Sequence, residues 1–163
     1  MRKPIFAAAM AATVLAACSQ MPAASPTPAL RMNASTPTLA GGYRKVAAPA
    51  GAAVYFVNLK DGDTVTSPFR VVFGVYGMGV APALTAKDLT GHHHLLIDTE
   101  LSAEEMKYAI PNDDKHVHYG TGATEAQLML PAGQHTLQIV FGNKNHEQFS
   151  PPIMSKKITI NVK

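Results

Sequence analysis

The chain after residue 53 consists largely of short segments in which apolar and polar residues alternate. The clearest is at the end, where Ile158, Ile160 and Val162 alternate with polar residues. A period of two predicts a β-strand with one buried face. Similar segments, separated by turn residues such as Asp61-Gly62, predict further strands at residues 54–59, 69–76, 91–98, 115–119, 126–130 and 135–141. About seven short strands favour an all-β fold, an antiparallel immunoglobulin-like β-sandwich, with a small barrel as the alternative.

One short helix interrupts this pattern. Ser102-Ala103-Glu104-Glu105 has the spacing of a capping box, in which a serine and a glutamate each bind the other's backbone. Pro111 limits how far the helix can extend.

The first residues follow a different pattern. A basic start, Met1-Arg2-Lys3, precedes an apolar run from Ile5 to Val14. That run is shorter than the roughly 20 residues needed to cross a bilayer, so residues 1–17 are predicted to be a signal peptide. Leu15-Ala16-Ala17-Cys18 resembles the lipobox of bacterial lipoproteins. The resemblance implies that Cys18 is lipidated, and Ser19 then favours a periplasm-facing lipoprotein in the outer membrane of a Gram-negative bacterium.

Residues 18–52 are rich in Ala, Pro, Ser and Thr and have few large apolar residues. Such a segment buries too little apolar area to offset its ordering entropy. We therefore expect the lipidated cysteine and a disordered tether over residues 18–52, followed by a domain over residues 53–163.

The charge of the domain narrows the choice of partner. From residue 53 onward, nine Lys and Arg face eleven Asp and Glu, although the whole chain is formally +3. A slightly acidic domain is not the basic surface that nucleic acids require. The predicted partners are the membrane, through Cys18, and an envelope protein or polymer.

All seven histidines lie in the predicted domain. Because side chains alternate along a strand, His93 lies on an apolar face, whereas His92 and His94 point outward. By the same rule, His116 and His118 share the polar face of the next segment.

These two His-x-His pairs predict a metal site. Residues two apart on a strand stand roughly 6.5 to 7 Å apart, so both rings of a pair can reach one ion. Imidazole suits copper and zinc, and either ion is the predicted cofactor. The predicted ligands are His92, His94, His116 and His118. Extra ligands or supporting groups are predicted among His93, His135, His146 and Asp98.

Several segments also resemble bacterial domain-of-unknown-function family 4399. They are Gly77-Met78-Gly79-Val80-Ala81-Pro82, Gly91-His92-His93-His94-Leu95-Leu96-Ile97-Asp98, Lys115-His116-Val117-His118-Tyr119-Gly120, Pro131-Ala132-Gly133-Gln134-His135-Thr136-Leu137-Gln138 and Pro151-Pro152-Ile153-Met154-Ser155. The resemblance covers nearly the whole domain and implies an exported protein without an established activity.

Three functions follow from these patterns. The first is an envelope lipoprotein whose domain binds copper or zinc. The second is an interaction module in which the histidines form a hydrogen-bond network without metal. The third is a metal-dependent enzyme, because three histidine ligands leave a position open for water. No nucleophile elbow, phosphate loop or metalloprotease helix is present in the sequence.

Overall fold

The structure is a computed structural model, and it describes residues 45–163. The predicted signal peptide, Cys18 and most of the predicted tether lie outside the described residues. Among the described residues, no helix has the length and apolar character needed to cross a membrane.

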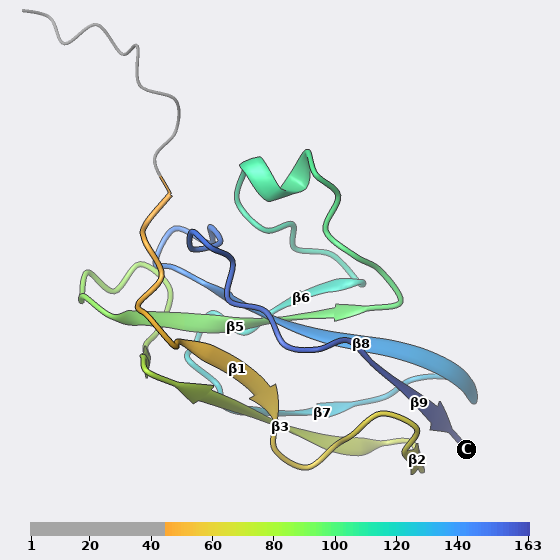
Figure 1. The fold of residues 1–163 in the computed structure, drawn as a ribbon. Coiled ribbons are helices and arrows are strands. Elements are labelled where there is room, and N and C mark those ends of the chain that lie inside the picture. The colour runs from red at the N-terminus through yellow and green to blue at the C-terminus, as the bar shows by residue number, and fades with distance from the viewer. Residues whose placement is uncertain (1–44) are drawn as a thin grey trace, which may run out of the picture. The chain divides into compact units, whose positions relative to one another are not determined.

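The described region is almost entirely β-structure, which confirms the predicted all-β class (Figure 1). Its strands are β1 (Ala53–Phe56), β2 (Thr64–Val65), β3 (Phe69–Tyr76), β4 (Gly79–Val80), β5 (Thr90–Ile97), β6 (His116–His118), β7 (Glu125–Leu128), β8 (Gly133–Gly142) and β9 (Ile158–Val162). The expected helix is a single 3₁₀ turn, Glu105–Lys107. Its capping box is present, because the Ser102 amide donates to Glu105 Oε2 and the Glu105 amide donates to Ser102 Oγ.

Two sheets form the two layers seen in Figure 1. The three-stranded sheet has the order β1-β3-β7, and the larger sheet has the order β2-β9-β8-β5-β4, with β6 also paired to β5. Most pairs are antiparallel, whereas β2–β9 and β4–β5 are parallel. This arrangement is compatible with the predicted immunoglobulin-like sandwich.

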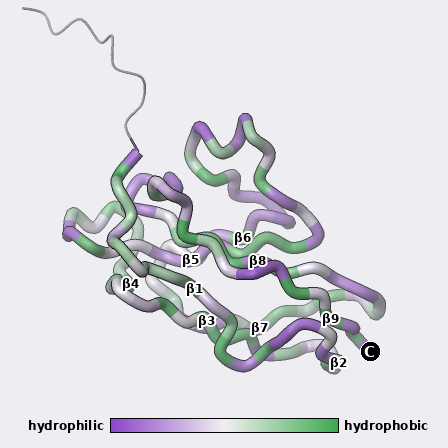
Figure 2. Tube along the Cα trace, viewed as in Figure 1, coloured by the Kyte–Doolittle hydropathy of each residue, from purple (hydrophilic) through white to green (hydrophobic). Residues whose placement is uncertain are grey.

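The main core lies between the two sheets. Val71 and Phe73 of β3 pack in one cluster with Leu95 of β5 and with Ile139 and Phe141 of β8. Val71 and Phe73, like Ile139 and Phe141, occupy alternate positions of their strands, and Figure 2 shows hydrophobic and hydrophilic stretches along both sheets. The period-two pattern therefore identified the core-facing side of each long strand.

Strand β5 departs from this rule, because every residue from Gly91 to Ile97 is buried. A second apolar cluster of Leu96, Val140 and Ile110 lies on its outer face. Ile110 belongs to the long connection between β5 and β6, which rises above the larger sheet in Figure 1. The outward-facing side of β5 is thus covered by loops rather than by solvent.

The residues just before β1 are bonded to the domain. The Ala48 amide donates to Ser150 O at 2.9 Å, and the Ser150 amide donates to Val46 O at 2.8 Å. Lys45 Nζ donates to Gln148 Oε1 at 2.8 Å and also bonds the Met106 carbonyl. Residues 45–52, which the sequence places in the tether, therefore contact the fold.

We expect a chain that begins at Ala53 to be less stable than one that begins at Lys45. It loses the two backbone hydrogen bonds to Ser150 and the Lys45 contacts, at a cost of about 1–3 kcal/mol in the free energy of unfolding. Urea denaturation of the two chains measures the difference. Equal midpoints would show that residues 45–52 add nothing to the fold.

Candidate metal centre

Four imidazoles from three separate segments meet on the outer face of the larger sheet. His92 and His94 come from β5, His118 from β6 and His146 from the loop after β8. Each ring offers one nitrogen, and these four nitrogens all lie within 4.8 Å of one another. Strand register explains part of this, because His118 pairs directly with His94.

The rings form a compact group, which we call the histidine cluster. Their centroids lie 4.8 Å apart for His94 and His118 and 4.5 Å apart for His118 and His146. His92 Nε2 and His94 Nε2 are 3.1 Å apart, so one donates a hydrogen bond to the other. His92 and His94 are fully buried, whereas His118 and His146 are partly exposed.

Several nitrogens of the cluster lack a hydrogen-bond partner among the described residues. They are Nδ1 of His92, Nδ1 of His94 and Nε2 of His118, all of them buried. A buried polar atom without a partner costs roughly 1–3 kcal/mol, and native proteins keep few of them. A metal ion held by a lone pair of each ring would leave fewer of these polar rings without a partner.

Burial favours the uncharged form of three of the rings. Desolvation, and then the proximity of His118 and His146, lowers the pKa of His92 from 6.5 to about 4. Desolvation and the neighbouring histidines lower the pKa of His94 to about 2, and desolvation lowers that of His118. Neutral imidazole is the form that binds metals, so these three rings are in a metal-binding form at neutral pH.

Two glycines make room for the rings. A Cβ atom on Gly142 would lie 2.9 Å from His94 Nε2 and 3.1 Å from His94 Cδ2. A Cβ on Gly120 would collide with the ring of His118. Neither glycine was predicted from the sequence, although Gly142 ends β8 and Gly120 follows β6 by two residues, and both strands carry a histidine.

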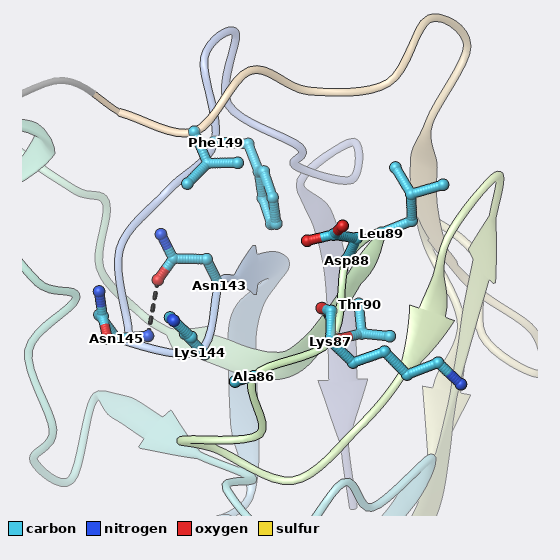
Figure 3. Close-up of a pocket in the computed structure, with 10 residues that line it drawn as sticks. Ala86, Lys87, Asp88, Leu89, Thr90, Asn143, Lys144, Asn145 and Phe149 are labelled. Carbon is cyan, nitrogen blue, oxygen red and sulfur yellow. Dashed lines mark hydrogen bonds between the residues drawn. The ribbon is translucent and has the colours of Figure 1, made fainter.

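The loop that carries His146 is fixed by Asn143. Asn143 Oδ1 accepts hydrogen bonds from the amides of Asn145 at 2.7 Å and Glu147 at 3.2 Å. The first of these is the dashed line in Figure 3. His146 itself has φ +66°, a left-handed conformation for which histidine is among the tolerant residues. Asn143 therefore helps to hold the fourth ring in place.

His116, one of the four predicted ligands, lies outside the cluster. It pairs with Leu96 rather than with a histidine, and its Nδ1 donates to Asp113 Oδ1 at 2.9 Å. His146, which was expected only as an extra or supporting residue, takes the fourth position. Both His-x-His pairs do share a face as predicted, but a register step of two residues carries His116 past the cluster.

The remaining predicted residues lie elsewhere. His93 is in the main core, where its ring is 5.1 Å from those of Phe73 and Phe141 and its Nδ1 donates to Ala123 O. His135 donates from Nδ1 to Asp98 Oδ2 at 2.7 Å and from Nε2 to Pro131 O at 3.0 Å. Two acceptors require both nitrogens to carry protons. The bond to Asp98 accordingly raises the pKa of His135.

A pocket of about 310 Å³ opens beside the cluster. It is lined by His94, His118, His146, Ala109, Ile110 and Asn112. A separate pocket of about 300 Å³, shown in Figure 3, involves the same loop through Asn143, Lys144 and Asn145. No histidine lines that second pocket among the described residues, so it is not part of the cluster.

Comparison with known proteins gives a family but no activity. Residues 71–163 match the model of a family described as a domain of unknown function (DUF4399). No curated protein matches the chain.

We expect the metal-free protein to lose stability as the pH falls from 6.5 toward 4. An unfolded histidine takes up a proton near 6.5, whereas folded His93 stays neutral down to about pH 4. The unfolded state therefore binds more protons in that window, at a cost of about 1.4 kcal/mol per pH unit for each such ring. In His93→Gln, the free energy of unfolding should fall less steeply with pH, by about 1.4 kcal/mol per pH unit. Urea denaturation at several pH values measures this slope.

His135→Gln is the control with the opposite sign. Because the pKa of His135 is raised, its bond to Asp98 stabilises the fold below pH 6.5 and this stability is lost at higher pH. Its removal should therefore leave the slope below pH 6.5 unchanged and abolish the loss of stability that this bond causes as the pH rises above 6.5. Equal slopes for His93→Gln and the unaltered protein would contradict the assignment of a neutral buried ring.

A methyl group at position 142 should disturb the cluster. Gly142→Ala forces the His94 ring or Ile110 to move, and overpacking of this kind costs about 1–3 kcal/mol. The free energy of unfolding and the NMR signals of the His94 ring report the change. Gly79→Ala is the control, because its Cβ would come no closer than 3.4 Å to Thr90. Equal stability of the two variants would show that the ring has free space.

Proposed function

The chain belongs to the DUF4399 family, whose description assigns no activity, and from that premise we propose that its domain binds one transition-metal ion. The ligands are His92, His94, His118 and His146. The observation that supports the proposal is the mutual approach of four imidazole nitrogens to within 4.8 Å. Buried ring nitrogens without a partner add to it, because a metal ion can take the lone pair of a neutral imidazole.

The ligand chemistry favours copper or zinc. Imidazole nitrogen suits both ions, and a site of nitrogen ligands binds copper more tightly than zinc by the usual affinity order. Hard oxygen-seeking ions such as magnesium and calcium need carboxylate or carbonyl ligands. The histidine cluster offers only imidazole ligands, so magnesium and calcium are poor candidates for the site.

We place this activity in the cell envelope. The support is the N-terminal sequence, with its basic start, short apolar run and Leu15-Ala16-Ala17-Cys18. Lipidation of Cys18 would attach the protein to a membrane, in our proposal the outer membrane, with the domain facing the periplasm. A metal site in this position would serve storage, delivery or sensing.

An interaction module without metal is the second candidate. The observation in its favour is that histidines here do form ordinary hydrogen bonds, such as those of His116 with Asp113 and His135 with Asp98. The cluster differs from these pairs, because its rings lie against one another and, among the described residues, none of them is bonded to a carboxylate. A buried nitrogen without a partner is not specific to the cluster, since His116 Nε2 is another. A hydrogen-bond network explains the pairs better than it explains the cluster.

The test compares two histidines two residues apart on the same strand. His118→Ala removes a proposed ligand, and we expect the affinity for Cu(II) or Zn(II) to fall by more than the roughly 10- to 100-fold that a lost hydrogen-bond partner of a ligand costs. His116→Ala removes a ring that is bonded to Asp113 instead, so affinity should stay nearly unchanged. Metal analysis of the untagged protein and calorimetric titration measure both.

The comparison separates the alternatives. Unchanged affinity in His118→Ala, or failure of the unaltered protein to bind either ion at one per chain, would refute the metal proposal. A loss of metal affinity in both variants would instead support the ligand set expected from the sequence, which contains both His116 and His118.

A further inference from the structure

The histidine cluster has a closed side and an open side. His92 and His94 lie on β5, fully buried beneath the loops, whereas His118 and His146 are partly exposed. The pocket of about 310 Å³ lies on the open side and is lined by His94, His118 and His146 themselves. An ion among these rings would be reachable from solution along one direction.

The rest of the pocket lining is uncharged. It consists of Ala109, Ile110 and Asn112, and no carboxylate lines the pocket within the described part of the chain. The nearby carboxylates have other partners, since Asp113 accepts a bond from His116 and Glu147 accepts one from Asn143. Among the described residues, no carboxylate is therefore placed in the pocket lining to act as a ligand.

An ion bound there would keep its full formal charge. Imidazole binds metals as a neutral ligand, so four histidines leave a divalent cation at +2. Such a charge in a largely buried position is costly unless a counter-charge accompanies it. Asn112 adds the one side-chain amide of the lining, and its N–H groups can donate to an anion.

We propose that the metal-loaded cluster binds a small anion as an additional ligand through the pocket lined by Ala109, Ile110 and Asn112. The proposal rests on the metal-binding function proposed above. On this proposal, the bound metal has a coordination position open to solution, unlike a structural site whose protein ligands fill every position. The same anionic chemistry can come from a free inorganic ion or from a carboxylate of a partner.

The first measurement is the metal content of the full-length chain after addition of one equivalent of Cu(II), before azide is added. Absence of bound copper refutes the metal-binding function, and the anion proposal with it. When copper is bound, azide is titrated and the azide-to-copper charge-transfer absorption is followed. We expect a saturating signal with one azide per copper.

Two alanine variants test the path of entry. Ala109→Leu fills the pocket beside the cluster, and it should weaken azide binding by roughly tenfold or more while copper stoichiometry is kept. Ala86→Leu is the matched control, because Ala86 lines the separate pocket in Figure 3 and azide binding should not change. Copper that gives no azide signal, or equal azide affinity in both variants, overturns the proposal.

Acetate distinguishes the two sources of the anion. Displacement of azide by acetate supports a carboxylate ligand. Failure of acetate to displace bound azide supports a small inorganic anion.

Discussion

Strand β5 is buried on both faces and paired on both edges, and the positions of the other elements follow from that. β8 lies along one edge, and β4 and β6 lie along the other. Its inner face contributes His93, Leu95 and Ile97 to the side of the main core, while its outer face carries His92 and His94 under the loops.

The polar residues of that outer face impose a chemical constraint. Imidazole nitrogens removed from water must find hydrogen bonds or an ion. The structure meets this requirement in part, through the single bond between His92 and His94. Bringing in His118 and His146 adds two more rings, each with one donor and one acceptor nitrogen when neutral, but no carboxylate. The cluster therefore has more buried nitrogens than hydrogen-bond partners for them among the described residues. This imbalance distinguishes it from the His116–Asp113 and His135–Asp98 pairs, where each ring faces a carboxylate.

Local pattern explains what could be predicted from the sequence. The bounds of β3 and β9 agree with the alternating segments 69–76 and 158–162, because a period of two is visible within a few residues. β2 and β4 have two residues each and are too short to show a period.

The ligand residues were harder to predict than the strands. His118 could be proposed from its face, whereas the choice between His116 and His118 depends on the register of β6 against β5, which no local pattern encodes. His146 lies in a turn held by Asn143, and periodicity says nothing about where a loop side chain points. The family resemblance, in contrast, could be recognised from its motifs and is confirmed.

The four rings are not held by equivalent means. His92, His94 and His118 are fixed by strand pairing, but His146 depends on a turn closed by the Asn143 side chain and on the bond from the Ile110 amide to the His146 carbonyl at 2.7 Å. Opening that turn would withdraw one ligand while the three strand-borne rings stay in place. For a bound ion, the equilibrium strength of the site would then be set mainly by the sheet, and its residence time by how often the turn opens. Asn143 would thus govern the rate of release, a property that can change without any change in the ligands themselves.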